Sequence, residues 1–528
     1  MITPLKLKKL LNSSQEIALI DLREEGDFGK EHILLATSLP ISQLELRIDS
    51  LVPNKQTKII LMDTCNEIIP QLAKKSLNKW NYNNIDILKG GLENWKKTGH
   101  EIYSGVNVPS KAFGEYVENT YKTPSLKPEE LKKLIEDKQD ILIFDARPND
   151  EYQRMSIPGA IDAPGVEIVN RACNLITNPD TQIIVNCAGR TRSIIGAQSL
   201  INIGLPNPIY TLENGTMGWH LSGYQLERGA AKYARCPSIN EKKGLRRLVE
   251  KVVKKYNVKF LDYDVFLEMK KTNKKSNLYF LDVRSPKEYS QTHIRGSRNA
   301  PGGQLVQATD KYIGVRNSKI ILVDDTETRS IMTASWLIQM GWTDVYVLKN
   351  GMIGNPDLTS SSFKPKIYGD PSSNSIPPRQ LKSLLERDQC FLIDISTSLK
   401  YREGHIPGSC WSLRSALKKE ISKINKYNKV VITSDDGTLA SLAVKDLENY
   451  FTEKDIFFLK GGTKHWEQNK YLTETKNSNF LCDTKDVQYK PYDHSEEAEK
   501  FMIEYLEWEI NLLDQININN SLTFPTFN

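Results

Sequence analysis

Short runs of apolar residues recur along the chain, and four of them end in an aspartate. They read IALID to Asp21, ILIFD to Asp145, LYFLD to Asp282 and CFLID to Asp394. Continuous apolar runs of this length are typical of buried strands. Amphipathic stretches such as LKPEELKKLIEDKQD and SIIGAQSLINIG alternate with the strand patterns. This alternation predicts α/β domains, each with a mainly parallel sheet flanked by helices.

The surrounding pattern repeats with each run. A turn segment containing His32, Ser156, His293 or His405 follows, then a second apolar strand and a glycine-containing turn. Asp145 lies 124 residues after Asp21, and Gly215 lies 124 residues after Gly91. The next two steps are 137 and 112 residues for the aspartate and 136 and 111 for the glycine. Because both markers advance together, we predict four tandem copies of one domain.

The predicted copies cover residues 1–105, 122–232, 255–356 and 375–475, and a helical tail covers 476–528. A basic connector separates the second copy from the third, and a Ser/Pro-rich linker separates the third from the fourth. The tail places Phe501, Tyr505, Trp508 and Leu512 on one helical face. We expect this face to dock on the last domain; a dimer contact is the alternative.

Composition narrows the class of protein. Of the 528 residues, 39% are hydrophobic and 26% charged, which excludes a largely disordered chain. The net charge of +6 is too small, for 528 residues, for a protein whose main role is to bind nucleic acid. Apolar runs stay below the length of a membrane span, and the N-terminus lacks a signal-peptide pattern. We expect a soluble cytoplasmic protein that binds neither nucleic acid nor membrane.

The spacing of the cysteines is compatible with a single reactive thiol. There are seven, and none shows CxxC spacing: Cys65, Cys173, Cys187, Cys236, Cys390, Cys410 and Cys482. A disulfide framework, a structural metal and a cofactor are therefore not expected.

Cys187 stands where chemistry is expected. The segment Cys187-Ala188-Gly189-Arg190-Thr191-Arg192-Ser193 directly follows a predicted strand and opens a predicted helix. Ligands of such folds bind at this sheet edge, where backbone N–H groups of the loop and of the helix N-terminus can converge on an anion. The helix dipole and two guanidiniums favour the thiolate, the nucleophilic form of cysteine.

These features resemble the rhodanese family. The D-x-R strand ends, the H-I-x-G turns, the closing Gly–Trp regions and the six-residue loop from Cys187 to Arg192 carry the resemblance, which extends to bacterial four-domain rhodanese-related sulfurtransferases. It implies that Cys187 takes sulfane sulfur from a small anion such as thiosulfate, forms a persulfide and passes the sulfur to cyanide or to a thiol, including a protein thiol. Ser156 replaces the turn histidine in the second copy, so we expect His32, His293 and His405 to be structural.

The repeat offsets place Asp63, Asp324 and Asp435 at the position of Cys187. A carboxylate cannot carry a persulfide, so we expect one active copy among four. Copy three keeps an arginine and a serine at Arg329 and Ser330, whereas copy four lacks the arginine. We expect copies one, three and four to bury the flanks of copy two and to form part of its entrance.

Individual roles leave alternatives open. Arg192 either binds the substrate anion or holds the loop through a carboxylate, whereas Arg190 should point more freely and bind substrate. Asp145 and Arg147 should pair and fix the strand end. Two other functions compete with sulfur transfer: a non-catalytic sulfur carrier or scaffold, and a cysteine phosphatase. The phosphatase loop has the form C-x5-R, and the loop here is one residue shorter.

Overall fold

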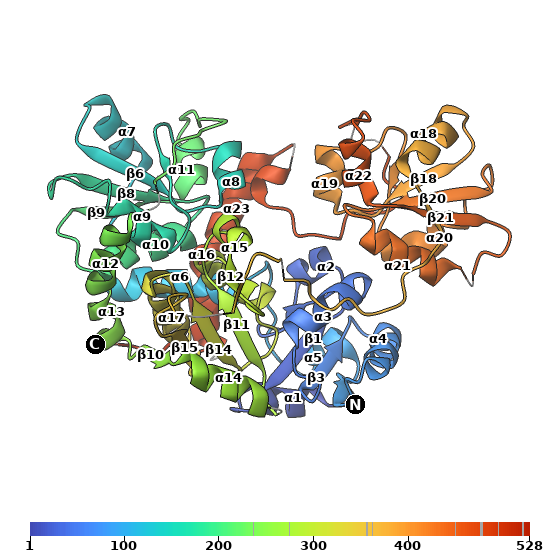
Figure 1. The fold of residues 1–528 in the computed structure, drawn as a ribbon, viewed down its shortest axis with the longest axis horizontal. Coiled ribbons are helices and arrows are strands. Elements are labelled where there is room, and N and C mark those ends of the chain that lie inside the picture. Colours follow the sequence, from blue (N-terminus) through green and yellow to red (C-terminus); the bar gives the residue numbers. More distant parts are fainter. Residues whose placement is uncertain are drawn as a thin grey trace.

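The computed structural model describes residues 1–235, 237–273, 275–354, 357–361, 363–448, 450–475, 479–494, 496–519 and 522–527. Cys236, the predicted end of the third copy at 356 and the predicted start of the tail at 476 lie outside these ranges. Within the described residues, four α/β domains follow one another along the chain, each built on a parallel sheet flanked by helices (Figure 1). The predicted fold class is confirmed.

The second domain shows the shared plan. Its strands lie in the order β5-β9-β8-β6-β7 and run parallel. The strands β6 (Ile141–Asp145) and β8 (Gln182–Asn186) pair at the centre, and α10 (Thr191–Asn202) begins five residues after β8. The other elements are β5 (Ser125–Leu126), β7 (Ile161–Asp162), β9 (Ile209–Leu212), α7 (Pro128–Glu136), α8 (Asn149–Arg154), α9 (Glu167–Ala172) and α11 (Gly215–Leu221).

The other domains repeat this plan, with the orders β2-β1-β3-β4, β10-β15-β14-β11-β13 and β17-β21-β20-β18-β19. The first domain contains α1 (Pro4–Leu11), β1 (Ile17–Asp21), α2 (Glu25–Lys30), β2 (Thr37–Ser38), α3 (Leu44–Leu51), β3 (Lys58–Met62), α4 (Ile68–Lys79), β4 (Ile85–Ile87) and α5 (Gly91–Lys97). The third contains β10 (Lys259–Leu261), α14 (Tyr263–Thr272), β11 (Leu278–Asp282), α15 (Pro286–Gln291), β13 (Arg298–Asn299), α16 (Gly302–Gln307), β14 (Lys319–Val323), α17 (Thr328–Gln339) and β15 (Val345–Leu348), and β12 (His293–Ile294) pairs antiparallel with β16 (Leu358–Thr359). The fourth contains β17 (Ser375–Ile376), α18 (Pro378–Glu386), β18 (Phe391–Asp394), α19 (Ser398–Glu403), β19 (Cys410–Trp411), α20 (Leu417–Ile421), β20 (Lys429–Thr433), α21 (Thr438–Leu447), β21 (Asp455–Leu459) and α22 (Gly462–Gln468).

Helices outside the repeats connect the domains. The basic connector forms α12 (Ile239–Leu248) and α13 (Glu250–Lys255), whereas α6 (Val108–Tyr121), between the first two domains, was not predicted. The tail helix α23 (Ala498–Asn519) packs against α6 rather than on the fourth domain, so the predicted docking site is wrong. The tail crosses back over the molecule, and α23 lies beside the second domain (Figure 1).

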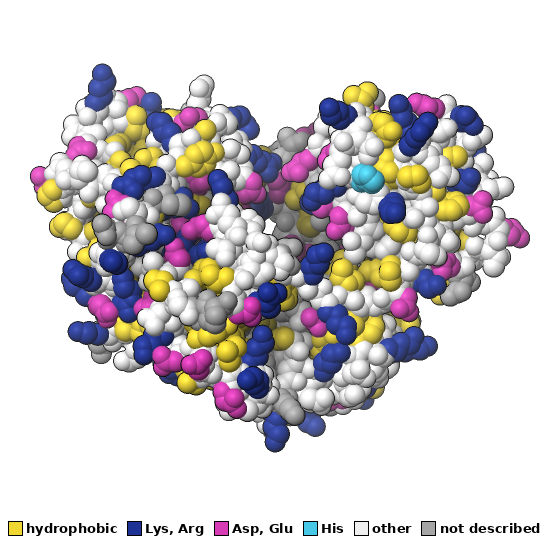
Figure 2. Space-filling view, in the orientation of Figure 1, with side chains coloured by type: hydrophobic (Ala, Val, Ile, Leu, Met, Phe, Trp, Pro, Cys, Tyr) yellow, Lys and Arg dark blue, Asp and Glu magenta, His cyan; other side chains and the backbone are white. Residues whose placement is uncertain are grey.

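The largest apolar cluster extends through three of the four domains and does not include the fourth. One continuous cluster joins the first three domains and the tail, and it includes Ile48, Ile194, Ile331 and Leu512. The fourth domain has separate clusters of its own, around Ile432 and Leu381. In Figure 2 the second and fourth domains form two upper lobes with a notch between them. The first three domains and the tail are thus packed as one unit, and the fourth domain is attached at its side.

No helix in the described parts of the chain combines the length and apolar character needed to cross a membrane.

Candidate active site

Cys187 lies directly after β8, and α10 begins four residues later. Its side chain is buried, with 2% of the residue exposed, and its Sγ donates to Ser193 Oγ at 3.4 Å. Ser193 Oγ in turn donates to the backbone oxygen of Arg190 at 2.8 Å. The first turn of α10 leaves backbone N–H groups without helical partners and carries the positive end of the helix dipole. The sulfur therefore lies beside a site suited to an anion.

The start of α11 fixes the first two residues of the loop. Thr216 N donates to Cys187 O at 2.8 Å, and Met217 N donates to Ala188 O at 3.0 Å. Gly215 has a φ of +56°, and a Cβ there would lie 2.3 Å from Cys187 O. The closing glycine of the repeat is required because the strand end and the loop approach its backbone so closely.

Arg192 is held by a carboxylate from α8. Its Nη2 lies 2.8 Å from Glu151 Oε2, and Lys490 of the tail also contacts Glu151 at 3.0 Å. Burial opposes the charge on Arg192, but Glu151 and the nearby Cys187 outweigh it and raise the pKa of the guanidinium above its ordinary value. The carboxylate contact, one of the two predicted alternatives, is present. Arg192 also lines the cavity described below, so a contact with substrate stays a prediction.

Arg190 does not point freely, in contrast to the expectation from sequence. Its Nε and Nη2 donate to the two carboxylate oxygens of Glu115 at 2.7 and 2.8 Å, and Nη2 also contacts Glu118. Burial raises the pKa of Glu115 to about 7, against the opposing effect of Arg190. Both carboxylates belong to α6, which lies in the segment between the predicted first and second copies. The amphipathic order of VPSKAFGEYVENTY could have revealed this helix.

The tail contributes a second buried carboxylate. Glu509 of α23 is fully buried, accepts from Thr191 Oγ1 at 2.6 Å and pairs with Lys111 of α6 at 3.2 Å. A Cβ on Gly189 would lie 3.0 Å from Met217 Cε and 3.1 Å from Glu509 Oε2. The loop is therefore enclosed by two helices outside the repeat. Only the apolar face of this tail was predicted from the sequence, and the role of Glu509 was not.

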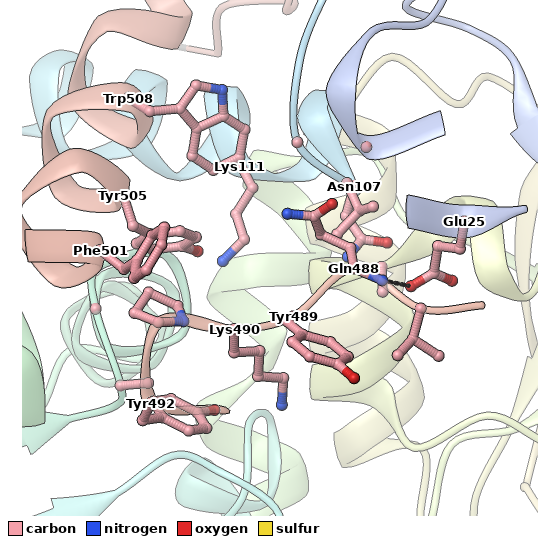
Figure 3. Close-up of a pocket in the computed structure, with 18 of the residues that line it drawn as sticks. Glu25, Asn107, Lys111, Gln488, Tyr489, Lys490, Tyr492, Phe501, Tyr505 and Trp508 are labelled. Carbon is pink, nitrogen blue, oxygen red and sulfur yellow. Dashed lines mark hydrogen bonds between the residues drawn. The ribbon is translucent and has the colours of Figure 1, made fainter. Parts of the chain in front are cut away.

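The loop opens into a cavity of about 930 Å³. Its wall combines the loop with α2, the start of α6, α16 with the turn that follows it, and the tail. Figure 3 shows Lys111 reaching from α6 toward Phe501 and Tyr505 of α23, with Tyr489, Lys490 and Tyr492 on the segment of the tail that precedes α23. No described residue between 375 and 475 lines the cavity, so the predicted contribution of the fourth copy to the entrance is absent from this wall.

Asp145 and Arg147 form a buried pair below the loop. Arg147 Nε and Nη2 donate to the carboxylate at 2.9 and 2.7 Å, and Asn186 Nδ2 donates to Asp145 Oδ2 at 3.1 Å. Arg147 also donates to the backbone oxygen of Met155. The same arrangement joins Asp21 to Arg23 and Asp282 to Arg284. The pair ties the end of β6 to β8 and to the turn after α8.

The turn histidines occupy structural positions in the other domains. His32, His293 and His405 are each 1% exposed, and each stacks on an aromatic ring four residues earlier. Their Nδ1 atoms contact the backbone oxygen of the same aromatic residue. They lie away from the Cys187 loop.

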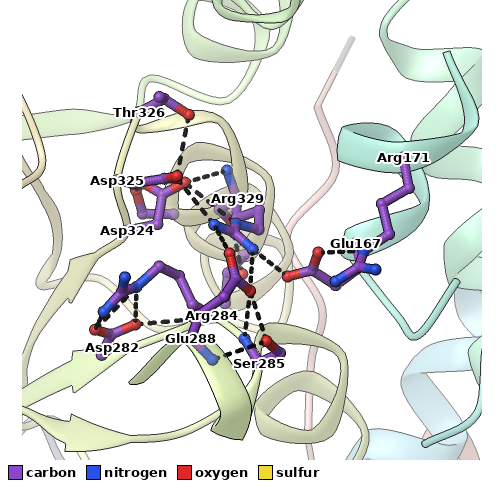
Figure 4. A network of polar contacts seen from close by, with 12 residues as sticks. Glu167, Arg171, Asp282, Arg284, Ser285, Glu288, Asp324, Asp325, Thr326 and Arg329 are labelled. Carbon is purple, nitrogen blue, oxygen red and sulfur yellow. Dashed lines mark hydrogen bonds and ion pairs between the residues drawn. The ribbon is translucent and has the colours of Figure 1, made fainter. Parts of the chain in front are cut away.

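The equivalent loop of the third domain is filled by a carboxylate. Asp324 is fully buried; it accepts from Ser330 Oγ at 2.7 Å and from Arg329 N at 3.0 Å. Figure 4 shows Arg329 at the centre of a network that reaches Glu288 and, in the second domain, Glu167. The Asp324 carboxylate of the third domain thus occupies the position that corresponds, in the second domain, to the place where an anion could bind beside Cys187.

The predicted position of the nucleophile in the fourth domain is wrong by one residue. Thr433, at the end of β20, pairs with Asp394, so Ser434 rather than Asp435 takes the place of Cys187. Thr463 N donates to Ser434 O, as Thr216 N does to Cys187 O. This domain is two residues shorter between the two strands than the others, which the glycine offset did not reveal. In the first domain, Asp63 does follow β3 directly.

Comparisons with known proteins agree with this architecture. A family model described as "Rhodanese-like domain" matches residues 3–98, 127–222, 264–354 and 377–469. The crystal structure of a thiosulfate sulfurtransferase from Pseudomonas aeruginosa superposes with a TM-score of 0.93 at 38% identity, covering 100% of this chain and 99% of that one.

Two curated relatives match shorter segments. The putative sulfur carrier protein YrkF of Bacillus subtilis is 28% identical over 127 residues, 22% of this chain and 67% of its own. The HTH-type transcriptional regulator Rv0324 of Mycobacterium tuberculosis is 30% identical over 91 residues, 17% of this chain and 39% of its own. The four matched segments together cover most of the chain, which therefore belongs to the rhodanese-like domain family.

Proposed function

We propose that the protein is a sulfurtransferase in which Cys187 carries the transferred sulfur as a persulfide. The observation that carries this proposal is the placement of Cys187: a thiol at the N-terminus of α10 lies at the wall of a cavity of about 930 Å³. The similarity over the full length to a thiosulfate sulfurtransferase supports it.

The proposed reaction has two displacement steps. The Cys187 thiolate attacks the sulfane sulfur of a small donor anion such as thiosulfate; the S–S bond of the donor breaks, and sulfite leaves with the electron pair. A thiolate or cyanide then attacks the outer sulfur of the persulfide, and Cys187 leaves as thiolate. No external oxidant or reductant is required, because each step forms one bond to sulfur and breaks another.

The surrounding groups supply the electrostatics of both steps. The N–H groups at the start of α10 and the guanidinium of Arg192 stabilise the donor anion and the leaving thiolate. Ala188, Gly189, Thr191 and Ser193 shape this cradle. Arg190, already paired with Glu115, acts on substrate mainly through the charge that it adds to the loop.

A mass measurement tests the proposal. After treatment with thiosulfate, Cys187 should gain one sulfur atom, about 32 Da, and lose it again on addition of cyanide. Cys187→Ser should neither gain sulfur nor release thiocyanate. Turnover of thiosulfate by this variant at the parental rate would refute the proposal, and hydrolysis of an aryl phosphate by the parent would favour a phosphatase.

A sulfur carrier is the second candidate, supported by the similarity to YrkF. A carrier would form the same adduct but would release its sulfur to one protein partner only. Catalytic release of thiocyanate or of persulfide to small thiols would exclude this alternative.

A further inference from the structure

The loop of the fourth domain borders a cleft of its own. The cleft measures about 320 Å³ and lies between this domain, the first domain and the linker that joins the third domain to the fourth. Ser434, Asp435 and Asp436 contribute to its wall, Glu24 enters from the first domain, and Asp486 enters from the tail. The fourth domain therefore keeps a hollow at the place where the second domain keeps its active site.

The charged residues around this hollow differ from those around Cys187. Tyr152 and Tyr401 mark equivalent positions, because each hydroxyl donates to the backbone oxygen eight residues later. The residue before the tyrosine is Glu151 in the second domain and Lys400 in the fourth. Where the second domain has Arg192, the fourth has Leu439. Two cations line the cleft, and carboxylates outside the Glu24–Asp486 pair hold both of them: Lys400 lies 2.8 Å from Asp435, and Arg414 lies 3.0 Å from Glu45 and 2.7 Å from Asp446.

Two carboxylates in the cleft have no cationic partner among the described residues. Glu24 accepts only from the hydroxyls of Ser42 and Ser415, at 3.2 and 3.1 Å. Asp486 is 8% exposed; its Oδ2 accepts from Ser398 N at 2.6 Å, and its Oδ1 has no partner in the described structure. Burial, and then the neighbouring Asp486, raises the pKa of Glu24 to about 7. Two buried carboxylates close together destabilise each other unless a positive group joins them.

We propose that this cleft is a second ligand site, which binds a small organic cation with an alkylammonium group. An ammonium carries three N–H donors, and Glu24 and the free oxygen of Asp486 supply acceptors. Trp411, Leu413 and Leu439 line the same cleft and suit a short alkyl chain. A metal ion fits less well, because the described residues hold no group of three or more His, Cys, Asp or Glu side chains arranged as ligands.

Binding is measured on the full chain by thermal unfolding and calorimetry at constant ionic strength. The probe is n-butylamine, and butan-1-ol serves as the neutral analogue of the same shape. With a Kd of about 1 mM, about 10 mM butylamine should raise the unfolding temperature of the full chain by roughly 1 °C, and butanol should not. An equal shift with butanol, or a shift with calcium chloride and none with the amine, would overturn the proposal.

Variants separate binding from folding. Asp486→Asn keeps an acceptor for Ser398 N and removes the unpaired charge, so the free protein should be at least as stable as the parent while the amine-induced shift falls at least threefold. Glu24→Gln should act in the same direction. Asp388→Asn, an exposed aspartate of the same domain, is the matched control and should keep the full shift. Persistence of the full shift in both cleft variants would refute the assignment. Cys187→Ser should bind the amine as the parent does. A failure of the amine-site proposal can therefore be distinguished from a failure of the proposed sulfur transfer.

Discussion

The second and third domains share a loop frame but differ in what occupies it. In both, the first residue of the loop directly follows a strand. An arginine lies five residues after this first residue, and a serine lies six residues after it. In the second domain the first residue is a thiol at the wall of a cavity. In the third it is Asp324, whose carboxylate already accepts the hydrogen bonds that the frame offers. The two domains therefore share the frame, but of these two loops only that of the second domain places a thiol beside the cavity.

The two arginines differ in what they connect. Arg192 and Arg329 pair with equivalent glutamates, Glu151 of α8 and Glu288 of α15. Arg329 is 1% exposed and also bonds Glu167, which belongs to the second domain. The arginine of the third domain thus links two domains, while that of the second domain borders the cavity.

We expect the largest effect from substitutions of the first loop residue, Cys187 in the second domain and Asp324 in the third. Cys187→Ser should lower sulfur transfer by at least about 10³-fold, because the nucleophile is removed. Adding Asp324→Cys to this variant should not restore activity, since position 324 is fully buried and is not among the described residues that line the cavity beside Cys187. Release of thiocyanate from thiosulfate and cyanide measures both. Recovery of activity in the double variant would show that the frame is sufficient after all.

Removal of the two arginines should have opposite consequences. Arg192→Ala should lower kcat/KM by about 10²–10³-fold, the usual effect of losing a group that stabilises a reacting anion. Arg329→Ala should leave kcat/KM within a few-fold but lower the free energy of unfolding by about 3–5 kcal/mol, because it strands buried carboxylates. Steady-state kinetics and denaturant unfolding of both variants provide the measurement. Equal losses of activity would contradict the division of roles.

A smaller effect should follow from loosening the tail. Glu509→Gln weakens the contact with Lys111 and leaves an acceptor for Thr191, so we expect kcat to fall about threefold to tenfold. Because Glu509 acts through the loop, KM for thiosulfate should change little. Glu507→Gln, an exposed change on the same helix, is the control and should leave both constants unaltered. A fall in stability with unchanged kcat would reduce Glu509 to a structural role.

Local patterns in the sequence were sufficient to predict the fold of the four domains. Strand and helix periodicity and the spacing of Asp145, Asp282 and Gly215 follow from short-range sterics and burial, so four copies could be predicted without structural data. The loop at Cys187 was also visible, because a strand, a loop and a helix start are contiguous in sequence. The register of the fourth copy was not, since strand pairing between Asp394 and Thr433 is a non-local fact.

The sequence by itself determined the repeated α/β architecture and the place of Cys187, directly after a strand and four residues before a helix. Only the tertiary structure decided what surrounds that thiol. Glu115 from α6, Glu509 from α23 and the cavity wall from the first and third domains lie tens to hundreds of residues away from Cys187. Their arrangement depends on how whole domains pack through one continuous apolar core, and no periodicity within a single segment records that packing.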